Sequence, residues 1–235
     1  AEGKDYYAVG AYEVSQDNTV LAWADDTNGR RQYTFRFRDL ATGKAYPEEL
    51  RGTSGDLVFA DDNRTVFYIE NDPETLLTKR VKRHVIGTDP AQDVVVYEEA
   101  DDSFYMGIDR TRDDRYIVIG VSSTVSDEIR YAPAADPQAF TVLAGRERDL
   151  EYQADHYGDR WVILTNADGA TNFKLVEAPS ESTSRGQWKD LVAHDPKVFV
   201  ESFELFDGFI AIAERSDALE RLRILKPDGS SEPVK

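Results

Sequence analysis

The 235-residue sequence contains no cysteine. This absence excludes a disulfide scaffold, a thiol nucleophile and a thiolate-bound zinc or iron–sulfur centre. Three histidines remain as the only strong nitrogen ligands, and they are scattered along the sequence. Long apolar runs are also missing, because runs such as 161–164 and 209–213 are far shorter than the roughly 18–20 residues that span a bilayer. We therefore expect no metal site, no cofactor and no membrane-spanning segment.

Positive charge is scarce. The chain has 28 Lys and Arg against 45 Asp and Glu, which gives a formal net charge of −17. Such a charge repels nucleic-acid phosphates and anionic lipid, and the only basic cluster, at 79–83, is too small to reverse it. The composition therefore predicts no nucleic-acid partner, no membrane partner and a preference for cationic partners.

The first residue is Ala1 rather than methionine, and neither the basic nor the apolar segment of an export signal follows it. This start indicates either a processed protein or a piece of a longer chain. We expect a cytoplasmic location, or a periplasmic one if a signal was removed.

Short apolar segments, each preceded by a polar turn, recur along the whole sequence at spacings of about 45–51 residues. They are 19–23, 65–69, 116–119, 161–164 and 209–212. The turns in front of them contain Asp, Asn and Gly, which tolerate tight hairpin geometry. Each segment is therefore interpreted as the second strand of a repeated unit.

Further strands follow in each unit, as in 32–38, where apolar and polar residues alternate with the period of two that marks a half-buried strand. Almost no segment has a helical period. The sequence thus predicts an all-β protein, a β-propeller with four-stranded blades. The chain 1–235 forms one partial propeller domain whose five visible blades are expected at approximately 6–50, 55–99, 103–145, 149–194 and 198–235.

No catalytic motif is evident. Gly52–Gly55 comes nearest to the Gly-x-Ser-x-Gly elbow of serine hydrolases, but its second glycine is one place early and no helix follows. It is interpreted as a loop between blades. Without such a serine, His84 on a strand, His156 at a hairpin and His194 in a loop are interpreted as structural or surface residues rather than general bases.

Several stretches carry a more specific resemblance. They are 10–15, 29–43, 62–69, 87–90, 96–99, 155–159 and 203–206, and the run Gly-Arg-Arg-Gln-Tyr-Thr at 29–34 is the most distinctive. Over essentially the whole chain these stretches resemble the propeller of the oligopeptidase B (protease II) branch of the prolyl oligopeptidase family of serine peptidases.

The resemblance implies a parent protein with a seven-bladed propeller and an α/β-hydrolase domain that carries a Ser-Asp-His triad. In that family the propeller limits access to short peptides, and this branch cleaves after Lys or Arg. The hydrolase segments lie outside this sequence, so no catalytic residue is assigned and the chain alone is expected to be inactive. The expected partners are short cationic peptides and the parent's own hydrolase domain.

Acidic residues fall on the segments expected to form the first strand of each blade, which lines the channel of a propeller. They are Glu13, Asp109, Glu151, Asp155, Glu201 and Glu204. Carboxylates facing the channel would concentrate a cationic peptide by a salt-sensitive focusing effect. The alternative, that the acidity only keeps the surface soluble, stays open at this point.

Two functions therefore remain. The favoured one is the substrate-gating propeller of a serine oligopeptidase, and the alternative is a free-standing propeller that binds a protein or peptide partner without chemistry. A downstream Gly-x-Ser-x-Gly followed by Asp and His in the reading frame would distinguish the first from the second.

Overall fold

The computed structural model describes residues 3–234, and over this range the regular secondary structure is almost entirely β-strand. The helical elements are three-residue 3-10 turns: η1 (Pro90–Gln92), η2 (Ala167–Gly169) and η3 (Arg185–Gln187). None of the described helices is long and apolar enough to cross a membrane. The all-β prediction is confirmed.

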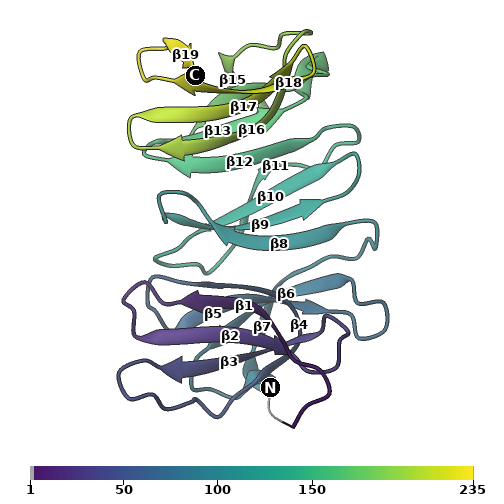
Figure 1. The fold of residues 1–235 in the computed structure, drawn as a ribbon, viewed down its shortest axis with the longest axis vertical. Helices are drawn as coiled ribbons and strands as arrows, with labels where there is room; N and C mark the ends of the chain where they lie inside the picture. The colour runs from purple at the N-terminus through teal and green to yellow at the C-terminus, as the bar shows by residue number, and fades with distance from the viewer. Residues whose placement is uncertain (1–2, 235) are drawn as a thin grey trace. The chain divides into compact units, whose positions relative to one another are not determined.

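The first sheet has seven antiparallel strands in sequence order (Figure 1). They are β1 (Ala8–Val14), β2 (Val20–Asp26), β3 (Tyr33–Asp39), β4 (Leu50–Phe59), β5 (Thr65–Asn71), β6 (Thr78–Val85) and β7 (Val94–Glu98). Strand β4 pairs with β3 through its first residues and with β5 mainly through its last, with a register shift between Thr53 and Leu57. The first two expected units therefore share one strand.

Residues Gly52–Gly55, expected to form a loop between blades, instead lie inside β4. The backbone can bend there without leaving the sheet because Gly52 and Gly55 adopt φ values of 68° and 102°, which side-chain-bearing residues rarely reach.

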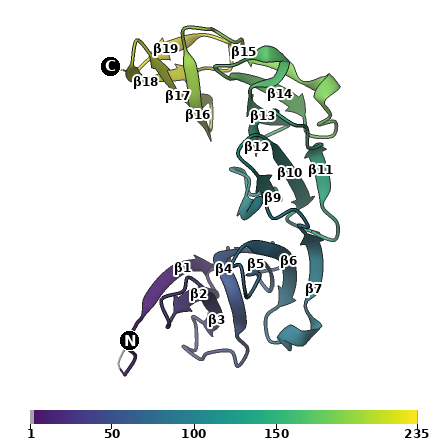
Figure 2. The same cartoon turned by 90° about the vertical axis from the view of Figure 1, so that its right-hand side faces the viewer.

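Three four-stranded antiparallel sheets follow (Figure 2). The first contains β8 (Tyr105–Arg110), β9 (Tyr116–Ser122), β10 (Asp127–Pro133) and β11 (Thr141–Ala144). The next contains β12 (Tyr152–Tyr157), β13 (Arg160–Thr165), β14 (Lys174–Pro179) and β15 (Lys189–Val192). The last contains β16 (Phe199–Phe206), β17 (Phe209–Ser216), β18 (Leu219–Leu225) and β19 (Ser231–Pro233).

The hairpins predicted in front of the apolar segments are confirmed. The second strands are β2, β5, β9, β13 and β17, and each follows a turn containing a residue with positive φ. These turn residues are Asn18, Asn63, Asp114, Gly158 and Gly208. Their side chains, or lack of one, tolerate the left-handed conformation, which is why Asp, Asn and Gly mark the repeat.

The chain divides into two compact units. Unit 1 comprises 1–110, 115–123 and 130–141, and unit 2 comprises 111–114, 124–129 and 142–235. Unit 1 contains two apolar clusters, one around Phe35 and Phe37 and one around Phe67, Ile117 and Ile119. Unit 2 is centred on the facing apolar residues of the β12–β15 and β16–β19 sheets. Burial of these alternating side chains provides the main driving force for folding each unit.

Candidate functional site

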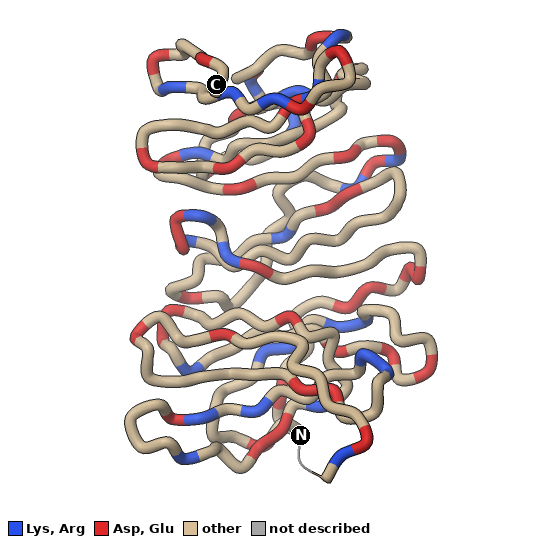
Figure 3. The backbone as a smooth tube through the Cα atoms, viewed as in Figure 1, with Lys and Arg blue, Asp and Glu red and all other residues tan. Residues whose placement is uncertain are grey.

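Asp and Glu residues are spread over both units (Figure 3). The predicted carboxylates also fall in both units. Glu13 lies on β1, Asp109 on β8, Asp155 on β12, and Glu201 and Glu204 on β16. Glu151, expected on a first strand, instead precedes β12 by one residue, because the backbone N–H of Glu151 is bonded by the side chain of Asn166 rather than by a neighbouring strand.

In unit 1, Glu13 lies in the electrostatic field of Asp109. Glu13 is exposed on β1, yet its neighbours displace enough water to raise the pKa of its carboxyl, and the negative charge of Asp109 raises this pKa further. Two like charges from strands distant in sequence thus share one region of the unit.

In unit 2 the carboxylate of Asp155 is held in a defined position. Its Oδ1 accepts hydrogen bonds from the backbone N–H groups of Arg112, at 2.8 Å, and His156, at 2.7 Å. Burial raises the pKa of Asp155, the two N–H donors act in the opposite direction, and the charges of Asp113 and Glu204 raise the pKa again. Asp155, Asp113 and Glu204 therefore form a second group of mutually repelling carboxylates.

The other two predicted residues are engaged with side chains of unit 2. Oε1 of Glu201 lies 2.7 Å from an Nη atom of Arg215, and Oε1 of Glu151 accepts a hydrogen bond of 3.2 Å from the amide of Asn166. A carboxylate that is ion-paired, or hydrogen-bonded to a side-chain amide, is less available to a cationic peptide. Glu151 and Glu201 are therefore weaker candidates for peptide contact than Asp155 and Glu204.

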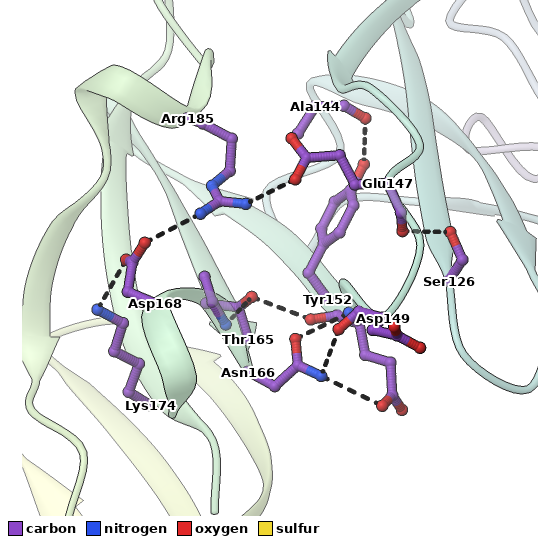
Figure 4. Close-up of polar contacts among 12 residues, drawn as sticks. Ser126, Ala144, Glu147, Asp149, Tyr152, Thr165, Asn166, Asp168, Lys174 and Arg185 are labelled. Atoms are coloured by element: carbon purple, nitrogen blue, oxygen red, sulfur yellow. Dashed lines mark hydrogen bonds and ion pairs between the residues drawn. The ribbon is translucent and has the colours of Figure 1, made fainter. Parts of the chain in front are cut away.

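Figure 4 shows the polar contacts around the connection between β11 and β12. The hydroxyl of buried Tyr152 donates a 2.7 Å hydrogen bond to the carbonyl of Ala144, and Arg185 links Glu147, at 3.5 Å, with Asp168, at 3.1 Å. These contacts fix the segment that leads into β12, and hence the start of the strand that carries Asp155.

The structure confirms the structural interpretation of His84. Its ring is fully buried in β6, stacks on Phe37 with centroids 5.8 Å apart, and bonds Asp93 through Nδ1 at 2.7 Å. His194 lies in a loop, where its Nε2 accepts a 3.4 Å bond from the backbone N–H of Asn172.

His156 has a partner that the sequence analysis missed. It lies within β12, and its Nε2 is 2.6 Å from Oγ of Ser180 while its Nδ1 is 2.8 Å from Oδ2 of Asp113. The donor–acceptor order is that of a Ser-His-Asp triad. However, His156 has no exposed surface, and the backbone N–H of Ser180 donates to the carbonyl of Asp159 rather than pointing at an oxyanion site.

We therefore interpret the chain of residues Asp113, His156 and Ser180, called the buried relay below, as a structural element of unit 2. It ties the β8–β9 turn, strand β12 and the end of β14 together. In the sequence, Asp113 lies at the turn between β8 and β9, and His156 lies on β12, the first strand of the next sheet. Nothing in the sequence around Ser180 indicates that it pairs with His156.

Within residues 3–234, no cluster of three or more His, Asp or Glu side chains has a geometry that could hold a metal ion.

Comparison with known proteins places these features in a family. Residues 1–234 match the family described as prolyl oligopeptidase, N-terminal beta-propeller domain. The chain is 67% identical over 233 residues to dipeptidyl aminopeptidase BI of Pseudoxanthomonas mexicana, which covers 99% of this chain and 32% of that protein. It is 26% identical to Protease 2 of Moraxella lacunata, covering 100% of this chain and 34% of the relative.

Solved structures agree with this match. Oligopeptidase B from Leishmania major has a TM-score of 0.91 at 28% identity, covering 100% of this chain and 34% of that one. Oligopeptidase B from Trypanosoma brucei has a TM-score of 0.88 at 26% identity, with the same coverage.

The chain thus spans about a third of the length of these relatives. The family inferred from the sequence is confirmed, whereas the relatives named Protease 2 or oligopeptidase B are much less similar to the chain than the dipeptidyl aminopeptidase is. With its propeller match over residues 1–234, the chain belongs to the prolyl oligopeptidase family of serine peptidases and forms part of the family's N-terminal β-propeller domain.

Proposed function

We propose that this chain is the substrate-admitting propeller region of a serine peptidase that hydrolyses short peptides. The hydrolytic triad then lies on an α/β-hydrolase domain outside this sequence. The family match over residues 1–234 and the threefold greater length of the relatives support this role.

The proposal includes five blades of a seven-bladed propeller. Strand β4 supplies the outer strand of one unit through 50–53 and the inner strand of the next mainly through 57–59, because its partners change from β3 to β5. Counted in this way, the chain contains five four-stranded units, and the remaining blades belong to the rest of the parent protein.

The paired carboxylates are proposed to attract the positive group of the peptide. The observation that carries this idea is the position of Asp155, which is held by two backbone N–H groups beside Glu204 even though burial and like charge disfavour its ionised form. A cation beside Asp155 would relieve the repulsion between the carboxylates and offset the solvation that Asp155 loses on burial. Glu13 and Asp109 offer the same arrangement in unit 1.

Two kinds of cation fit this chemistry. One is the Lys or Arg side chain that an oligopeptidase B-like endopeptidase would recognise. The other is the free α-amino group of a peptide, which is favoured by the 67% identity to a protein named dipeptidyl aminopeptidase BI. Paired fluorogenic substrates with a free or an acetylated amino end distinguish them, because an aminopeptidase requires the free amine and an endopeptidase does not.

The test of steering uses the full-length parent with Asp155→Asn and Glu204→Gln. We expect the double variant to lower kcat/KM for cationic peptides by about 3- to 30-fold at low salt, with little change in kcat, because long-range charge acts on association. The loss should shrink as ionic strength rises. Glu74→Gln, on the turn between β5 and β6, removes one negative charge from an exposed site and serves as the control for each single substitution.

An equal loss for cationic and neutral substrates that is insensitive to salt would contradict steering. It would indicate damage to the fold instead.

A further inference from the structure

Unit 2 contains a pocket between the β12–β15 and β16–β19 sheets, with a volume of about 290 Å³. Its walls come from the turns after β12, β16 and β18, and they are largely apolar, with Leu205, Phe206, Phe209 and Leu225 among the lining residues. The Phe206 and Phe209 rings stack with centroids 4.7 Å apart. The volume lies at the lower end of the range for small-molecule sites, which suits one large apolar side chain rather than an extended ligand.

Arg112 does not itself line the pocket, but it lies over the ring of Phe206, which does. The guanidinium carbon of Arg112 lies 5.2 Å from the centroid of the Phe206 ring, a cation–π arrangement that restricts the side chain. The backbone N–H of the same residue is bonded to Asp155, so both ends of Arg112 are fixed.

The guanidinium of Arg112 forms no ion pair with a carboxylate of the described residues. Two basic residues line the pocket and have acidic partners, since Arg160 lies 2.5 Å from Glu177 and Lys226 lies 3.1 Å from Glu232. Arg112 is exposed and forms no ion pair with any residue between 3 and 234, although the chain carries a net charge of −17. Its guanidinium thus keeps its N–H groups free for an anion, and the planar fork suits a carboxylate.

The pocket also adjoins the carboxylates of the proposed function. Phe206 lies two residues beyond Glu204 on β16, and Tyr157, another lining residue, lies two residues beyond Asp155 on β12. Residues two apart share a face of a strand, so the aromatic wall continues the acidic surface. A short peptide whose cation is near Asp155 is therefore within reach of the pocket.

We propose that this pocket receives the apolar side chain of a short peptide whose free C-terminal carboxylate pairs with Arg112. The inference rests on the proposed function for the identity of the ligand as a peptide. It adds a requirement for an apolar residue followed by a free carboxylate.

The test measures binding to the 235-residue chain with N-acetyl-phenylalanine and N-acetyl-phenylalanine amide, by calorimetry and by chemical-shift changes of backbone amides. Both probes carry the apolar side chain, and only the first carries the carboxylate. We expect the acid to bind about tenfold more tightly than the amide, the size of one charge-assisted pair. The amides of Gly158, Gly208 and Gly229, which line the pocket, should shift with both probes.

Arg112→Gln should abolish the preference for the acid and leave the affinity of the amide unchanged. Arg148→Gln removes the same charge from a side chain that is 87% exposed and does not line the pocket, and it should keep the preference. Because both variants alter exposed residues, a far-UV spectrum identical to that of the parent chain shows that the comparison concerns binding alone.

Equal affinity for the two probes, or a preference that survives Arg112→Gln, would overturn the assignment. Shifts confined to residues away from the three glycines would equally refute the pocket. Neither probe carries a cation, so these results do not depend on steering by Asp155 and Glu204, and either hypothesis can fail without the other.

Discussion

The buried relay gives the sharpest prediction about stability. Ser180→Ala removes the hydroxyl that lies 2.6 Å from the His156 Nε2 atom, while the imidazole stays fully buried and hydrogen-bonded to Asp113. A buried polar group that loses its partner destabilises the folded state by about 1–3 kcal/mol. The 2.6 Å separation and the complete burial of the ring place the expected loss in the upper half of that range.

The measurement is urea unfolding of the 235-residue chain, followed by circular dichroism. With a slope of about 3 kcal/mol/M, a loss of 1–3 kcal/mol lowers the midpoint by about 0.3–1 M. Ser184→Ala is the matched control, because the Ser184 side chain forms no capping bond at η3, and it should change stability by less than about 0.5 kcal/mol.

A midpoint equal to that of the control would refute the structural role of the relay. The same protein also tests the chemistry, since the chain alone should not hydrolyse a fluorogenic peptide with arginine at the scissile position. Turnover that copurifies with the chain and disappears in Ser180→Ala would show that the relay is catalytic.

Three further outcomes are expected. Asp155→Asn should stabilise the chain at neutral pH, because the raised pKa of Asp155 means that its ionised form is unfavourable in the folded state. Below the ordinary carboxyl pKa, Asp155 is protonated in both the folded and the unfolded state, so the gain in stability should vanish. Urea titrations at several pH values measure this change. Gly10→Ala should destabilise by about 1–3 kcal/mol, because its Cβ would lie close to the Tyr33 ring, whereas alanine at exposed Gly107 on β8 should have a smaller effect in the same assay. The chain should self-associate through exposed apolar residues such as Tyr12 (72% exposed) and Leu222 (52%), and light scattering that shows a concentration-independent monomer would contradict this expectation.

Local patterns explain why the fold could be predicted. In β9, Ile117, Ile119 and Val121 are buried and their neighbours are not, so burial follows the period of two that a strand produces. The hairpin turns require a left-handed backbone conformation, which Asn and Asp tolerate, so these residues indicate the hairpins in the sequence. The continuity of β4 was missed because Gly52–Gly55 has the composition of a loop, and only pairing with strands on both sides keeps it extended.

The candidate site depended on information of another kind. The sequence determined that the chain is acidic and all-β, and which carboxylates fall on or beside first strands. Only the tertiary structure decided that Asp155 lies in the field of Glu204, that Glu201 is neutralised by Arg215, and that Arg112 rests on Phe206. The physical reason is that the alternation of a strand relates residues two positions apart, which the sequence shows directly. These contacts instead join strands tens of residues apart, and they form only when the apolar faces of the sheets pack together.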